Sequence, residues 1–240
     1  MTRKPSDDPV SSTVMVIPVT IADVPFNDSE ADIVLCTANN VHCLVHRLFL
    51  SFASPFFKDL FKLPQPVPEQ VSTDKDGRPI IHITEDHKTI NMLLRFCYLS
   101  MDTEMDTLED IQTMLAVMTK YDMHRSIELV RKQLRSPAFV EKEPLCVFAI
   151  AYRYQLRDEA IAAMKESTRF PLVGPDCSEL RNIPASGYLQ YLRYRTLCSE
   201  SVVAAIDGDF MIRPGPRTEP SSLVLTAAKA VASGLLVSWH

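Results

Sequence analysis

Residues 32–46, with the sequence DIVLCTANNVHCLVH, constrain the fold more than any other stretch of the chain. Two apolar runs flank a polar turn at residues 38–40, which is the pattern of a β-hairpin. A turn-rich all-β fold is disfavoured for the rest, because the chain has only 6 glycines against 17 prolines. We therefore predict an α+β fold in which a small sheet is flanked by helices.

Two helices are predicted directly after the hairpin. The first covers Arg47 to Ala53. Ser54 and Pro55 restart the helix, since serine is a favoured N-cap and proline a favoured first helical residue. The buried stripe predicted for this second helix consists of Phe56, Leu60 and Phe61.

The remainder of the chain is predicted to be mostly helical. After a loop over 63–79, residues 80–84 alternate like a short strand. Residues 86–98 are predicted to form a helix whose buried side consists of Ile90, Leu93, Leu94 and Cys97. From residue 108 to about 205 the pattern is helical almost throughout. The predicted organisation is a tail over 1–28 with a candidate edge strand at 14–21, a mixed α/β domain over 29–100, an all-α extension over 101–206, and a linker with a short helix over 207–240.

Charge and targeting signals argue against several classes of protein. The chain carries 25 Lys and Arg against 30 Asp and Glu, a net charge of −5, whereas a nucleic-acid binder usually presents a basic face. The polar N-terminus does not read as a secretory signal. Residues 221–240 are apolar around Lys229, so we expect a short helix and no membrane contact, with a tail anchor as the alternative. Six scattered cysteines without a CxxC pair indicate reduced thiols in an intracellular protein, cytoplasmic or nuclear.

No catalytic or metal-binding motif stands out. The sequence contains no P-loop, GxGxxG, GxSxG or HExxH pattern. His42, Cys43 and His46 are close together, but in a strand Cys43 points away from the two histidines, and no second pair of ligands follows. We therefore expect no enzyme activity, no cofactor and no metal site.

Three segments resemble the BTB/POZ domain in their order and spacing. They are residues 31–35 (ADIVL), 45–50 (VHRLFL) and 53–57 (ASPFF). Their motif positions are Leu50, Ser54, Pro55, Phe56 and Phe57. The resemblance implies a BTB/POZ-like small sheet with flanking helices.

The resemblance continues more weakly along the chain. Residues 81–83 and 93–98 are similar to the closing strand and helix of that domain. Later segments resemble the helical extension of fungal BTB proteins, which implies an all-α extension after the domain; they are residues 120–123, 149–152 and 191–194.

The resemblance also implies a protein–protein interaction module without catalysis. BTB/POZ domains commonly dimerise, and some bridge substrates to cullin-type ubiquitin ligases. The expected partners are therefore a second copy of the chain and a cullin. The alternative is a transcription-associated or scaffold protein that uses the same fold without binding a ligase.

Two candidate sites come from side chains in the motifs. Asp32 and Arg47, with His46 beside them, match the charged pair that lines the BTB dimer pocket; the alternative is an internal structural pair. Val67 and Glu69, on either side of a proline, resemble the apolar-x-Glu segment of cullin-binding members.

A third candidate is the edge of residues 14–21, which can pair with a strand of another chain. Pro18 weakens such pairing because proline has no N–H to donate. Residues 22–31 are also too short for the long helix that precedes the hairpin in exchanged-strand BTB dimers. The sequence therefore departs from that form of dimer.

Overall fold

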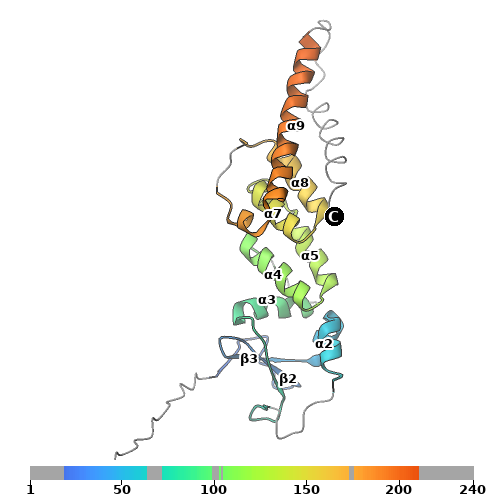
Figure 1. The fold of residues 1–240 in the computed structure, drawn as a ribbon. Coiled ribbons are helices and arrows are strands. Elements are labelled where there is room, and N and C mark those ends of the chain that lie inside the picture. The colour runs from blue at the N-terminus through green and yellow to red at the C-terminus, as the bar shows by residue number, and fades with distance from the viewer. Residues whose placement is uncertain (1–18, 64–71, 99–102, 104, 173–175, 211–240) are drawn as a thin grey trace, which may run out of the picture. The chain divides into compact units, whose positions relative to one another are not determined.

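The computed structural model describes residues 19–63, 72–98, 103, 105–172 and 176–210 (Figure 1). The chain divides into two compact units. The first contains residues 1–52 and 57–98, and the second contains residues 53–56 and 99–240. Of the predicted edge strand at 14–21, the structure describes only residues 19–21, and Thr20–Ile21 form a short strand that pairs within the chain. Residues 14–18 and the predicted helix near the C-terminus lie outside the described residues.

The first unit contains a four-stranded sheet with the order β1-β3-β2-β4. β2 and β3 are antiparallel, with Ile33 opposite Val45, and this confirms the predicted hairpin. β1 runs parallel to β3, and β4 runs parallel to β2. The strands are β1 (Thr20–Ile21), β2 (Ile33–Cys36), β3 (Val41–Val45) and β4 (Ile80–His82).

The turn of the hairpin is closed by side-chain hydrogen bonds. The Thr37 hydroxyl accepts the backbone N–H of Val41 at 3.0 Å. Asn40 adopts a φ of 60°, a left-handed conformation that asparagine tolerates better than most residues. The polar residues of the turn therefore fix the register that places the apolar side chains of β2 and β3 in the core.

Three helices accompany the sheet in sequence: α1 (Arg47–Ala53), α2 (Pro55–Leu60) and α3 (His87–Cys97). Asp86 caps α3, because its carboxylate accepts the backbone N–H of Thr89 at 2.8 Å. The predicted buried stripe of this helix is confirmed, and it consists of Ile90, Leu93, Leu94 and Cys97. These residues and the apolar residues of β2 and β3 supply the core of the first unit.

The predicted face of α2 is wrong. Pro55 is the first helical residue, as expected, but Phe56 is 44% exposed and Phe57 is buried at 1%. Leu60 and Phe61 are half-buried, and Phe61 lies just beyond the end of the helix. A helix of six residues has fewer than two turns, so its apolar pattern does not fix which side faces inward.

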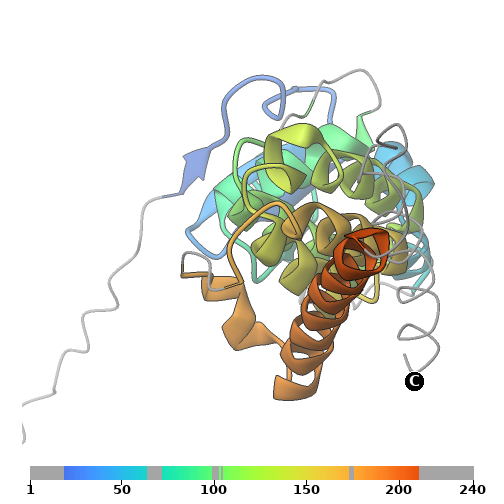
Figure 2. The same ribbon diagram turned by 90° about the horizontal axis from the view of Figure 1, so that it is seen from above.

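The second unit is helical in the part that the structure describes (Figures 1 and 2). α9 is a single long helix that continues to Phe210, past the predicted end near residue 205. None of the helices in the described part of the chain is both long and apolar enough to cross a bilayer. The elements are α4 (Leu108–Lys120), α5 (His124–Leu134), α6 (Pro137–Val140), α7 (Pro144–Arg153), α8 (Arg157–Ser167), the 3₁₀ helix η2 (Ser178–Asn182) and α9 (Ala185–Phe210).

A buried ion pair joins α5 to α8. Arg131 donates from Nε and from one terminal nitrogen to the two carboxylate oxygens of Glu159, at 3.0 and 3.1 Å. The Glu159 side chain is only 1% exposed, whereas that of Arg131 is 25% exposed and also contacts Glu128 at 2.7 Å. Such a bidentate contact fixes the relative position of the two helices, because it requires both nitrogens to face the carboxylate. Loss of either partner would leave a poorly hydrated charge.

A buried arginine of α9 contacts the C-terminal end of α8. The guanidinium of Arg195 donates to the backbone carbonyls of Ser167 and Phe170, the latter at 2.6 Å. These carbonyls lie at and just after the C-terminus of α8, where a positive charge interacts favourably with the helix dipole. Arg195 thereby joins α9 to the end of α8.

Candidate protein-interaction surface

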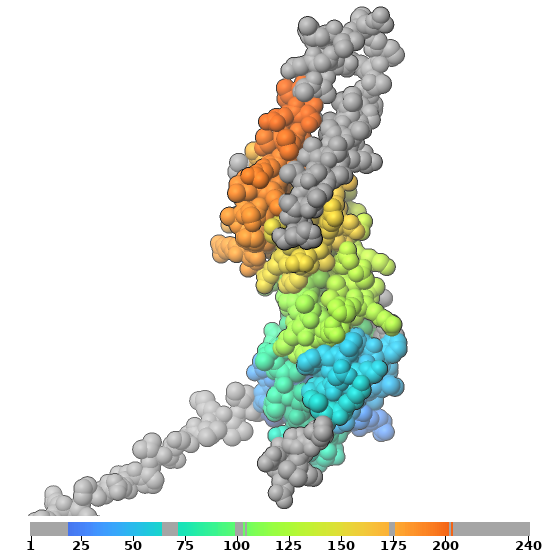
Figure 3. Space-filling model, turned by 45° about the vertical axis from the view of Figure 1, so that its right-hand side comes forward, coloured from blue at the N-terminus to red at the C-terminus, as the bar shows by residue number. Residues whose placement is uncertain are grey.

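An apolar surface covers the outer side of α1 in the first unit. Leu48 is 75% exposed, Phe52 is 63% exposed and Phe49 is 39% exposed. Leu48 and Phe52 are four residues apart and therefore lie on the same side of the helix. Figure 3 shows the segment that contains α1 and α2, drawn in light blue to cyan, at the molecular surface. We call Leu48, Phe49 and Phe52 the α1 surface.

The α1 surface exists because the helix has more apolar residues than it can bury. Its sequence is RLFLSFA, and Leu50 is its only fully buried side chain, with no exposed area. A seven-residue helix presents one stripe to a core, so the remaining large side chains face solvent. Clustered exposed apolar side chains mark interaction sites more often than scattered ones do.

An aromatic cluster holds the start of α1 in place. The Tyr98 hydroxyl accepts the backbone N–H of His46 at 3.0 Å, and the Tyr98 ring lies 4.4 Å from the ring of Phe49. Phe26 packs edge-on against Tyr98, at 5.5 Å between ring centres. Burial raises the pKa of Tyr98. His46 also approaches Asp28, with 3.8 Å between Nε2 and Oδ2.

Asp32 acts as a cap for α1 from a distant position in the sequence. Its Oδ1 accepts the backbone N–H of Arg47, the first residue of the helix, at 2.8 Å. A carboxylate at this position satisfies one of the free N–H groups of the first turn and suits the positive end of the helix dipole. The contact of Asp32 is therefore with the backbone of Arg47, not with its charged group.

The Arg47 guanidinium lies elsewhere. Its central carbon is 5.6 Å from the centre of the Phe61 ring, and its Nε is buried without a hydrogen-bond partner. Among the described residues, no ion pair joins Arg47 to Asp32. Asp32 and Arg47 are therefore in contact through the backbone of Arg47, and the role of the pair in a dimer pocket stays a prediction.

Ser54 and Phe56, two further motif residues, both contact Tyr121. Ser54 is completely buried, and its hydroxyl donates to the backbone carbonyl of Tyr121 at 2.5 Å. The ring of Phe56 lies 5.4 Å from the ring of Tyr121. The predicted cullin-binding residues Val67 and Glu69 lie outside the described residues, so their placement stays a prediction.

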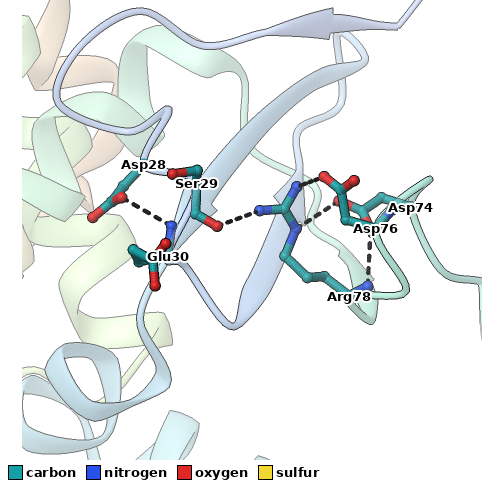
Figure 4. Close-up of polar contacts among 6 residues, drawn as sticks. All are labelled: Asp28, Ser29, Glu30, Asp74, Asp76 and Arg78. Atoms are coloured by element: carbon teal, nitrogen blue, oxygen red, sulfur yellow. Dashed lines mark hydrogen bonds and ion pairs between the residues drawn. The ribbon is translucent and has the colours of Figure 1, made fainter.

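A polar cluster anchors the loop before β4 to the segment that precedes β2 (Figure 4). Arg78 pairs with Asp74 at 2.8 Å, contacts Asp76, and donates to the backbone carbonyl of Ser29 at 3.1 Å. Gly77 has a φ of 78°, a left-handed conformation that a residue with a side chain rarely adopts. Burial acts to raise the pKa of Asp74, but the hydrogen bonds from Arg78 outweigh it, and the net pKa is lowered. The cluster fixes β4 and is not an open site.

Sequence reasoning missed two groups of residues. The α1 surface was missed although the run LFLSF signals an excess of apolar residues. The second group is Cys146, Cys177 and Glu179, whose ligand atoms lie within 4.8 Å of one another. It is the only such metal-ligand group within the described ranges, and it does not include His42, Cys43 or His46. No local spacing could reveal it, because its cysteines are far apart in the sequence.

Residues 25–137 match the family model of the BTB/POZ domain. The BTB/POZ match begins before β2 and ends at Pro137, so it includes α4 and α5 and extends past the predicted boundary at residue 100. The BTB/POZ family is a family of non-catalytic interaction domains. No curated protein matches the sequence.

Proposed function

We propose that the chain is a non-catalytic protein-interaction module and that its α1 surface binds a second copy of the chain. The observation that carries this proposal is the exposure of Leu48 and Phe52 on one side of α1, at 75% and 63%. Fully burying a leucine or phenylalanine side chain contributes about 1.5–3 kcal/mol. The α1 surface lies within the matched BTB/POZ segment, which supports protein binding as its purpose.

The chemistry of the α1 surface favours self-association. Its three side chains are uncharged, and the nearby Arg47 guanidinium lies over the Phe61 ring. Homodimer interfaces are apolar at their centre and poor in charged residues. Two identical apolar patches related by a two-fold axis meet without repulsion, and each copy then covers the other.

The test is the mass of the full-length chain in solution, measured by light scattering during size exclusion. Leu48→Asp places a charge in each half of the proposed interface, so the dimer loses the burial free energy of two leucine side chains. Two lost contributions of about 1.5–3 kcal/mol each predict a dissociation constant raised about 10²- to 10⁴-fold. The wild-type chain should be a dimer at micromolar concentration, and the variant should be a monomer.

Leu129→Asp is the matched control, because Leu129 is also a solvent-facing leucine on a helix, 46% exposed on α5. It should leave the dimer intact. A wild-type monomer at all concentrations, or a Leu48→Asp dimer as stable as the control, would remove the α1 surface from self-association.

A finer role as a cullin adaptor rests on the sequence alone. Val67 and Glu69 resemble the apolar-x-Glu segment of cullin-binding BTB proteins. Glu69→Lys should weaken retention of a purified cullin without changing the dimer, and Glu85→Lys, a second acid of the same unit, serves as the control. Equal retention of both variants would favour the transcription-associated or scaffold role. The six free thiols favour a reducing intracellular compartment for either role.

A further inference from the structure

Two cysteines and a glutamate converge in the second unit. Cys146 is in the first turn of α7, Cys177 is the residue before η2, and Glu179 is in the first turn of η2. Their sulfur and oxygen atoms all lie within 4.8 Å of one another. The side chains of Cys146 and Cys177 are buried, with 7% and 4% exposure, and neither cysteine is in a disulfide.

We propose that Cys146, Cys177 and Glu179 bind a zinc ion that joins η2 to α7. Zn–S bonds of about 2.3 Å in a tetrahedron place two thiolate sulfurs about 3.8 Å apart. The observed grouping within 4.8 Å is close to that geometry and needs only a small inward movement. Two thiolates select zinc over magnesium or calcium, which prefer ligands that are all oxygen.

Two features of the local geometry suit zinc binding. Cys146 lies at the positive end of the α7 dipole, where a thiolate is stabilised. The Cys177 thiol donates to Oε2 of Glu179 at 3.3 Å, so the carboxylate already faces the sulfur. When zinc binds, the two thiols lose their protons to solvent, Glu179 supplies an oxygen, and water takes the fourth position.

The experiment uses the full-length chain, purified under reducing conditions, stripped of metal with a chelator and titrated with Zn²⁺ against a chromophoric competitor. The chain should bind one zinc per molecule. Cys146→Ser and Cys177→Ser should abolish this uptake, and Glu179→Gln should weaken it about tenfold or more. Cys97→Ala is the matched control, because Cys97 is an equally buried thiol on α3 in the other unit, and it should leave zinc binding unchanged.

A second measurement does not depend on the folding of any variant. Co²⁺ added to the metal-free wild-type chain should produce the near-ultraviolet absorption of thiolate-to-metal charge transfer, and Zn²⁺ should remove it. The proposal is overturned if the wild-type chain binds no more zinc than the Cys146→Ser/Cys177→Ser variant, or if Co²⁺ produces no thiolate absorption. A Cys146–Cys177 disulfide that forms in the presence of excess zinc would also overturn it.

Discussion

The position of Asp32 gives the sharpest prediction about how the α1 surface is presented. Asp32→Ala removes the carboxylate that accepts the Arg47 N–H at 2.8 Å. Loss of a helix N-cap costs about 1 kcal/mol, within a range of about 0.5–2 kcal/mol. Asp32→Asn keeps an oxygen in the same place, and asparagine caps helices nearly as well as aspartate. We therefore expect the alanine variant to lose stability in α1 and the asparagine variant to retain most of it.

Hydrogen exchange followed by mass spectrometry is the suitable assay, because it reports local opening of one segment. A loss of about 1 kcal/mol corresponds to about a fivefold fall in the protection of the amides in residues 47–53. Amides of α8, in the other unit, serve as the internal reference and should be unchanged in both variants. The fall in protection should be seen with alanine and should be much smaller with asparagine.

A backbone cap and a side-chain ion pair predict different coupling energies between Asp32 and the Arg47 side chain. The contact uses the backbone N–H of Arg47, so Arg47→Met leaves it in place. In a double-mutant cycle of Asp32→Ala and Arg47→Met, the coupling energy should be near zero. A coupling energy of about 1 kcal/mol or more, or an asparagine variant as damaged as the alanine variant, would refute capping and restore the charged pair.

Three further predictions concern stability. Glu159→Ala should lower the free energy of unfolding, measured by urea denaturation, by about 3 kcal/mol. This is the low end for a broken buried ion pair, because Arg131 keeps its contact with Glu128. An effect below about 1 kcal/mol would show that the ion pair is solvated. Phe57→Ala should cost about 3–5 kcal/mol and Phe56→Ala less than half of that, whereas equal losses of melting temperature would contradict the observed burial. Hydrogen bonds from the first turn of α3 hold the pKa of Asp86 below its usual 3.8. The stability that Asp86 gives to α3 is therefore present above pH 3.8 and is lost as the pH falls through the pKa of the folded state. Asp86→Asn should flatten this part of an acid titration of amide protection in α3, and an unchanged profile would contradict the cap.

The parts of the fold that were predictable from sequence have local, repeated signals. The hairpin over 32–46 has two apolar runs and a polar turn, so its pairing could be predicted. The stripe of α3 runs over about two turns after a capping aspartate, which fixes both its start and its buried side. Short α2 has no such repetition, and its predicted face was wrong by one residue.

The parts that could not be predicted depend on contacts between distant residues. Asp32 caps a helix that begins fifteen positions later in the chain, and no sequence rule for N-caps covers such a distance. Cys146 and Cys177 meet because η2 packs against α7, which no spacing in the sequence indicates. The α1 surface is an intermediate case, since a run of apolar residues in a short helix predicts that some are exposed but does not say which.

The central claim is that the α1 surface contacts a second copy of the chain. The most direct measurement places a photo-crosslinking amino acid at position 48, irradiates the purified full-length chain and identifies the cross-linked peptides by mass spectrometry. The account predicts a covalent product of twice the chain mass in which position 48 is joined to residues 47–53 of the other copy. A product that remains at the mass of one chain, or a cross-link from position 48 to any other part of a second copy, would contradict it.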